Sequence, residues 1–129
     1  MTKQEIFDTI VEISASVCNV STDDIMNQCR KFDAVTARSV ATFWCIAAGF
    51  SVESLMRCAD LQNHNSIDSI KAKIEEYWVE RFAYHMLVRE VGKRLLEVAH
   101  SIGEDFDAWK PIDHIQKNTG KVYYQKSPF

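Results

Sequence analysis

Proline is missing from the first 110 residues of the chain, and this absence constrains the fold more than any other sequence feature. Proline and glycine mark the tight turns that connect short strands, whereas long stretches without either residue favour helices. Before Pro111 the only glycines are Gly49, Gly92 and Gly103. The sequence therefore predicts an all-α protein with long helices.

The first two helices are predicted from apolar spacing and capping residues. Isoleucine and valine residues three and four apart predict an amphipathic helix over residues 4–18. Ser21, followed three residues later by Asp24, resembles a capping box and predicts the start of a short second helix.

The next two helices are predicted from their expected ends. Residues 29–33 are expected to form a loop that ends at Asp33, the expected N-cap of a third helix over residues 34–48. Gly49 suits the left-handed conformation that ends such a helix. Ser51 is the expected N-cap of the fourth helix.

Two long helices are predicted after a short turn. A fifth helix is expected over residues 64–79, capped by Asn63, and a sixth over residues 81–102. Because no helix breaker lies where they meet, one continuous helix is the alternative. Beyond Gly103 the apolar pattern fails, and residues 103–129 are expected to form a loosely structured tail.

Composition excludes several classes of function. The chain has no uncharged apolar window of about 18 residues, so no membrane span is expected. Its first residues lack the basic and apolar stretches of a secretory signal, so we expect a cytoplasmic protein. The four cysteines form no C-x-x-C pair and the histidines are isolated, so no metal or cofactor site is predicted. No pairing of nucleophile and base stands out, so no catalytic role is predicted.

The bulky aromatic residues and one histidine are expected to have structural roles. Trp44, Trp78 and Trp109 are predicted to be core or interface anchors rather than cofactor contacts. His85, which lies among apolar and aromatic neighbours, is expected to be a packed or half-exposed helix residue rather than a ligand.

The fourth helix, the turn and the fifth helix together have the size of a helix-turn-helix. This motif places the start of its second helix in the major groove, where polar side chains contact base edges. Asn63, His64, Asn65 and Ser66 occupy that position. Asparagine can form two hydrogen bonds with adenine, and serine can contact a base or a phosphate. The same residue types also begin ordinary helices, so this pattern alone leaves both interpretations open.

Three segments of the chain carry a family resemblance. The first pairs residues 6–11, Ile-Phe-Asp-Thr-Ile-Val, with residues 20–25, Val-Ser-Thr-Asp-Asp-Ile. The second comprises Arg30 and residues 35–41, Val-Thr-Ala-Arg-Ser-Val-Ala. The third spans residues 51–67 and ends in Asn-His-Asn-Ser-Ile.

Together these segments resemble the C-terminal DNA-binding domain, domain IV, of the bacterial chromosomal replication initiator DnaA. That domain has a Trp-repressor-like helix-turn-helix fold with a helix of the form Val-x-Ala-Arg-Gln-x-Ala. The resemblance covers about residues 5–78. The third segment is the most specific, because it keeps the register of the family from residue 51 to residue 67 and also the histidine, His64.

The resemblance implies a grip on both grooves of double-stranded DNA. The start of the fifth helix would contact bases in the major groove, Arg30 would enter the minor groove and Arg38 would bind the backbone. The predicted DNA-binding residues are Arg30, Lys31, Arg38, Gln62, Asn63, His64, Asn65 and Ser66. The alternatives are a solvated loop at Arg30 and Lys31, and an ion pair between Arg38 and Asp33 or Asp24.

The chain also departs from the pattern of the family. Asp60-Leu61-Gln62 replaces a Gly-Gly-Arg sequence, so a phosphate-binding arginine is lost. Asn63 replaces an aspartate, which exchanges a pure acceptor for a donor and acceptor and should alter base preference. The formal net charge is −3, whereas proteins that bind DNA through phosphates are usually basic. The rival interpretation is therefore a protein-interaction module that kept the fold and lost DNA binding.

The expected organisation has three parts. Residues 1–79 would form the helix-turn-helix domain of five helices, and residues 80–102 a helical extension packed on the core or at a dimer interface. The tail, residues 103–129, would follow. No phosphate-binding G-x-x-x-x-G-K-[ST] motif is present, so no nucleotide is expected. A homodimer formed through the C-terminal helices would present two DNA-reading sites.

Overall fold

The computed structural model describes residues 2–27, 30–60 and 64–102, without the side chains of residues 64–66 and 99–102. Within these ranges the chain forms helices and no strand, which confirms the all-α prediction. The helices are α1 (Lys3–Cys18), α2 (Thr22–Met26), α3 (Phe32–Ala47), α4 (Val52–Cys58), α5 (His64–Glu80) and α6 (Phe82–Ile102). None of the helices in the described ranges is long and apolar enough to cross a membrane.

The ends of α1 and the start of α2 follow local capping chemistry. Thr2 Oγ1 accepts a hydrogen bond from the Glu5 amide at 3.1 Å, which satisfies one of the free donors of the first turn. Asn19 ends α1 in the left-handed conformation, with φ of 57°. Ser21 Oγ accepts from the Asp24 amide at 3.0 Å, as the sequence predicted.

The start of α3 differs from the prediction. Asp33 is not the N-cap, because the helix begins at Phe32 and Lys31 occupies the cap without a side-chain hydrogen bond. The Phe32 ring packs edge-on against Tyr77, with centroids 6.2 Å apart, and this tertiary contact favours an earlier start. Asp33 instead lies in the first helical turn, where the helix dipole favours its carboxylate.

The end of α3 and the start of α4 are as expected. Gly49 has a φ of +93°, a conformation that residues with a side chain rarely adopt. Ser51 Oγ then accepts from the Ser54 amide at 3.2 Å and caps α4.

The two C-terminal helices are separate, which confirms the two-helix prediction over the continuous alternative. The break falls at Arg81. His85 lies one turn into α6, and its Nε2 is 2.8 Å from the carbonyl oxygen of Trp78 near the end of α5. Since a carbonyl can only accept, the ring donates from Nε2 and satisfies a carbonyl that the end of the helix leaves free.

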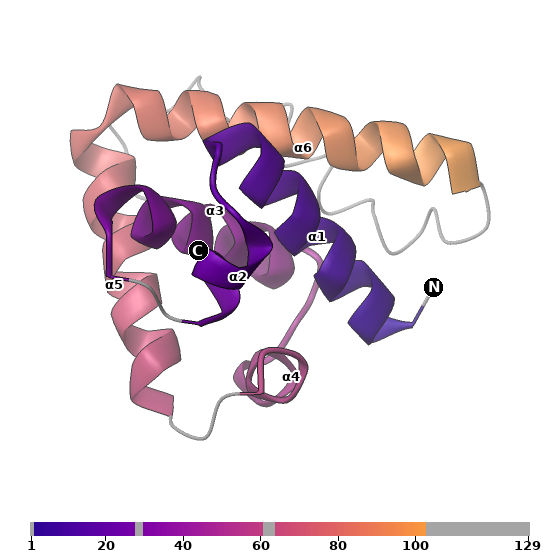
Figure 1. Cartoon of the computed structure of the whole chain (residues 1–129), viewed down its shortest axis with the longest axis horizontal. Coiled ribbons are helices and arrows are strands. Elements are labelled where there is room, and N and C mark those ends of the chain that lie inside the picture. The colour runs from indigo at the N-terminus through magenta and orange to yellow at the C-terminus, as the bar shows by residue number, and fades with distance from the viewer. Residues whose placement is uncertain (1, 28–29, 61–63, 103–129) are drawn as a thin grey trace.

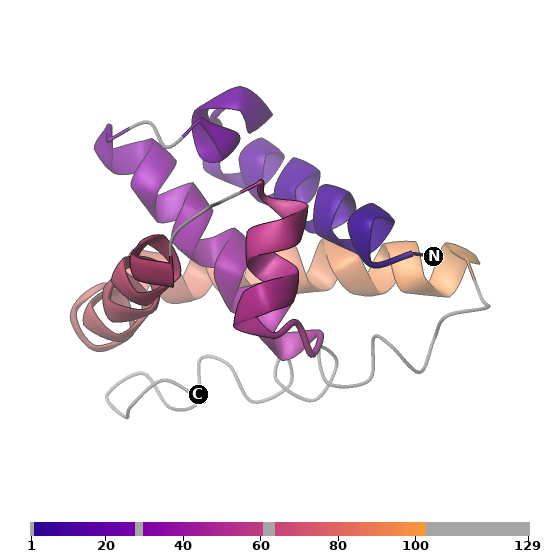
Figure 2. The same cartoon turned by 90° about the horizontal axis from the view of Figure 1, so that it is seen from below.

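Figures 1 and 2 show α3 passing through the middle of the molecule, with α6 and α1 crossing over it and α5 beside it at a steep angle. The interior is rich in aromatic rings. Trp44 and Trp78 are both fully buried, as expected, and Phe43 stacks on Trp78 with centroids 5.4 Å apart. Trp44 Nε1 donates to the Val88 carbonyl at 3.0 Å, which ties α3 to α6.

The helix beyond residue 80 completes this core. Val88, Val91 and Leu95 of α6 are fully buried, and α6 packs against α1, α3 and α5. The helix beyond residue 80 therefore shares one core with α1, α3 and α5, whereas a dimer interface through it stays a prediction. Trp109 and the expected tail lie outside the described residues.

Candidate nucleic-acid interface

The α4–α5 pair forms the end of the molecule where the predicted recognition residues begin. In Figure 1, α4 is seen end-on while α5 runs down the picture beside it. Leu55 of α4 and Ile67 of α5 are both buried in the same core, so the two helices share one packing surface. Between them the chain turns at Asp60, which has a left-handed φ of 55°.

The fifth helix begins at the predicted residue, His64. Ile67 is 2% exposed and Ile70 is half-buried, so both turn toward the core as expected. Gln62 and Asn63 lie outside the described residues, and so do the side chains of His64, Asn65 and Ser66. Their assignment to DNA therefore stays a prediction.

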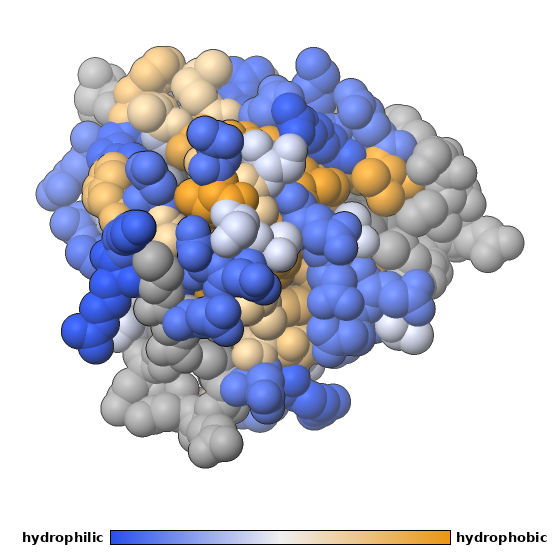
Figure 3. All heavy atoms as spheres, viewed as in Figure 1, coloured by the Kyte–Doolittle hydropathy of each residue, from blue (hydrophilic) through white to orange (hydrophobic). Residues whose placement is uncertain are grey.

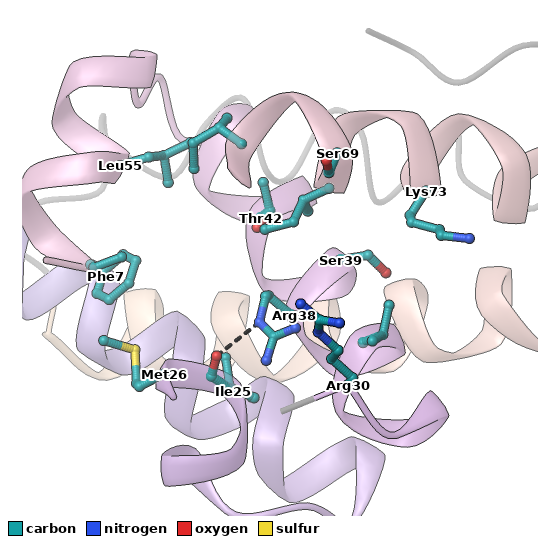
Figure 4. Close-up of a pocket in the computed structure, with 14 residues that line it drawn as sticks. Phe7, Ile25, Met26, Arg30, Arg38, Ser39, Thr42, Leu55, Ser69 and Lys73 are labelled. Carbon is teal, nitrogen blue, oxygen red and sulfur yellow. Dashed lines mark hydrogen bonds between the residues drawn. The ribbon is translucent and has the colours of Figure 1, made fainter. Parts of the chain in front are cut away.

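Two of the predicted basic residues lie on the same hollow as the first half of α5. This hollow has a volume of about 470 Å³. Arg30 and Arg38 line it, together with Ile67 and Ile70 of α5 (Figure 4). Residues that are distant in sequence are thus brought together beside the start of the fifth helix.

Arg38 is held in place by the end of α2. Its Nε donates to the Ile25 carbonyl oxygen at 2.9 Å, and one terminal nitrogen donates to the Asp24 carbonyl oxygen at the same distance. These carbonyls belong to the last turn of a short helix, where no intrahelical donor is available. This contact of Arg38 with Asp24 is a hydrogen bond to the backbone carbonyl and therefore not the ion pair with the carboxylate that the sequence suggested as an alternative.

Lys31 is separated from the other predicted basic residues. It is exposed and lines a different, smaller hollow together with Asp24 and Asp33. The hollow that Lys31 lines therefore includes two acidic residues.

Lys73 is a basic residue of this region that the sequence analysis did not single out. It lies on α5, lines the 470 Å³ hollow and forms an exposed ion pair with Glu76 at 3.1 Å. The hydrogen bond to Glu76 raises the pKa of Lys73. The sequence could have indicated this residue, because Lys73 follows Ser66 and Ile70 at helical spacing and therefore lies on the same face of the helix.

In the described ranges, the buried histidine and cysteines have structural positions. His85 is 1% exposed, so it is a packed rather than a half-exposed residue. Burial raises the pKa of the Cys18 thiol to about 11 and also raises that of Cys45, which keeps both thiols protonated and unreactive at neutral pH. Among the described side chains, no group of three or more His, Cys, Asp or Glu residues could hold a metal ion.

A comparison with family models, curated proteins and solved structures finds no match for this chain.

Proposed function

We propose that this protein binds double-stranded DNA in a sequence-dependent way, through the start of α5 and the basic residues beside it. The observation that supports this proposal most is the meeting of Arg30 and Arg38 on one hollow with the first half of α5. The initiator resemblance assigned these residues to the same DNA surface from separate parts of the sequence. A protein that contacts the major and the minor groove of one DNA site needs these residues close together in space.

The chemistry of the surface also suits a polyanion. The 14 described residues that line the hollow include three cations, Arg30, Arg38 and Lys73, and no carboxylate. The small number of cations implies a modest electrostatic contribution. With about three phosphates neutralised, the logarithm of the binding constant should fall with the logarithm of salt concentration at a slope of about −3.

The decisive experiment is selection of duplexes from a random pool at low salt, followed by mobility shifts with the enriched sequence. We expect one sequence class to be enriched. The double variant His64→Ala with Arg30→Ala should lose sequence preference while its helical circular dichroism spectrum stays unchanged. Arg89→Ala is the matched control, because Arg89 is an exposed arginine on α6 that does not line the hollow. The proposal fails if no sequence is enriched and mobility is unchanged at low salt, or if the double variant binds like the control.

A second candidate function is protein interaction through the corner between α5 and α6. Four large apolar side chains are about half exposed: Phe32 at 59%, Val79 at 47%, Phe82 at 59% and Met86 at 49%. Figure 3 shows hydrophobic atoms gathered near this corner, at the upper left of the view. Exposed apolar groups of this kind are typical of interfaces, and the occupant that we propose is a second copy of the chain.

This second candidate is tested by sedimentation equilibrium without DNA. Phe82→Glu with Met86→Glu should convert a dimer to a monomer, whereas Lys93→Glu, an exposed change on the same helix, should not. A wild-type protein that is monomeric at high micromolar concentration would contradict it. The DNA proposal would survive that result, because a monomer can still bind a single site.

A further inference from the structure

The hollow beside α5 has the dimensions of a small-molecule site. Its volume of about 470 Å³ falls within the range of about 300–1,000 Å³ that is usual for ligand pockets. Side chains from five helices, α1 to α5, line it. Several of these elements are far apart in sequence, so the hollow is a product of the tertiary fold.

The lining is mostly apolar. Eight of the 14 lining residues are hydrophobic: Phe7, Ile25, Met26, Val35, Leu55, Ala59, Ile67 and Ile70. Phe7, Ile25, Leu55 and Ile67 are each at most 5% exposed, so they form a fixed floor rather than a mobile surface. An apolar group of a ligand that covered this floor would gain about 25 cal/mol for each Å² removed from water.

The polar part of the lining carries one sign of charge. Within the described part of the chain, Arg30, Arg38 and Lys73 line the hollow with three hydroxyl residues and no carboxylate. In Figure 4, Phe7, Met26 and Leu55 lie toward one side, Arg30 and Lys73 toward the other, and Arg38 between them. The hollow therefore has an apolar end and a cationic end.

We infer that this hollow binds a small amphipathic carboxylate, with its apolar part on the floor and its carboxylate among the three cations. Arg38 is the central anion contact, because its two bonds to the carbonyls of Asp24 and Ile25 already fix its guanidinium. A guanidinium that is held before the ligand arrives loses little conformational entropy on binding. This inference does not depend on DNA binding and is tested without DNA.

The experiment is an amide NMR titration of the full chain with monomeric decanoate. Shift changes are expected at the amides of Thr42 and Ile70, beside the hollow, and not at Val91, which is buried in α6 away from it. Decanol, which has the same tail and no charge, should bind about tenfold more weakly, as expected for the loss of charge-assisted hydrogen bonds. Equal affinity for decanol and decanoate would overturn the inference, and so would the absence of shifts at the hollow.

Variants test the cationic end separately from the floor. Arg30→Gln with Lys73→Gln should weaken decanoate binding about tenfold and leave decanol binding unchanged. The matched control is Lys71→Gln with Arg89→Gln, which removes two exposed cations that do not line the hollow. Ile70→Trp should block both ligands by filling the space. If the charge variant binds decanoate as tightly as the control, the three cations do not select the ligand and the inference is wrong.

Discussion

The two halves of α5 lie in contrasting surroundings. In the second half, Tyr77 is 6% exposed, Trp78 is fully buried, and His85 of α6 packs on Trp78 with ring centroids 4.1 Å apart. In the first half, Ile67 is buried, but Ile70 faces an open hollow, which Lys73 also lines from just beyond the middle of the helix. One helix thus joins a dense aromatic core to a surface with room for a ligand.

This difference separates the parts of α5 that hold the fold from those available for function. Aromatic side chains bury large areas and fix their neighbours by shape, so the second half anchors the helix. In the first half, Ile70 is only half-buried and lines the hollow, so a ligand there would leave the aromatic core intact. Substitutions should therefore affect stability at one end of the helix and binding at the other.

The largest effect should come from Trp78→Ala. Removing a fully buried tryptophan leaves a cavity between α3 and α6 and should lower the free energy of unfolding by about 3–5 kcal/mol. Ile70→Ala, at the half-buried end of the same helix, should lower it by only about 1 kcal/mol. Urea denaturation of both variants measures the two losses in free energy of unfolding, which can then be compared. Equal losses would show that the two halves do not differ in their contribution to stability.

A smaller effect is expected for Arg81→Ala, at the junction of α5 and α6. The guanidinium lies 4.5 Å from the Phe32 ring centre and 4.4 Å from that of Tyr77, and it donates to Thr36 Oγ1 at 3.1 Å. Losing these contacts should lower stability by about 1–2 kcal/mol in urea denaturation.

Arg81→Lys provides the control for this junction. Lysine keeps the charge but lacks the planar guanidinium that lies close to both rings, so it should restore only part of the lost stability. Full recovery by lysine would assign the effect to charge rather than to the planar group.

Alkaline pH should also weaken the core. Cys45 is buried, and burial raises its pKa above the ordinary value of 9.0, so the folded state binds this proton more tightly than the unfolded chain does. The resulting stability is fully present below about pH 9 and is lost as pH rises toward the folded pKa. Above about pH 9, each fully buried group of this kind should lower the free energy of unfolding by up to about 1.4 kcal/mol per pH unit.

Urea denaturation at pH 8 and pH 10, each value being about one unit from this threshold, measures the loss. Burial also raises the pKa of Tyr84 and, to about 11, that of Cys18, so both contribute in the same direction. Cys45→Ala should reduce the loss between the two pH values. A loss identical to that of the wild type would show that Cys45 does not contribute.

The smallest change in the free energy of unfolding is expected for substitutions at the cationic end of the hollow. Arg30→Gln with Lys73→Gln should change the free energy of unfolding by less than about 0.5 kcal/mol, because exposed charges and exposed ion pairs contribute little to stability. Thermal and urea denaturation would measure it. A loss above about 2 kcal/mol would show that these side chains belong to the structural core of the fold.

Much of the helical framework could be predicted from the sequence, because helix formation depends on local properties. Apolar spacing and capping residues predicted α1, the cap of α2 at Ser21, the left-handed Gly49 and the start of α5 at His64. The start of α3 was predicted wrongly. Phe32 joins the helix through its contact with Tyr77, a residue 45 positions later, and local propensity contains no information about such a contact.

The sequence by itself determined an all-helical chain with a polar start to its fifth helix and basic residues at 30 and 38. Only the tertiary structure decided which residues meet. Arg30, Arg38 and Lys73 line one hollow in the structure, whereas Lys31 lines another one together with Asp24 and Asp33. The physical reason is that helical periodicity sets which residues share a face, whereas the packing of five helices decides which faces enclose the same space.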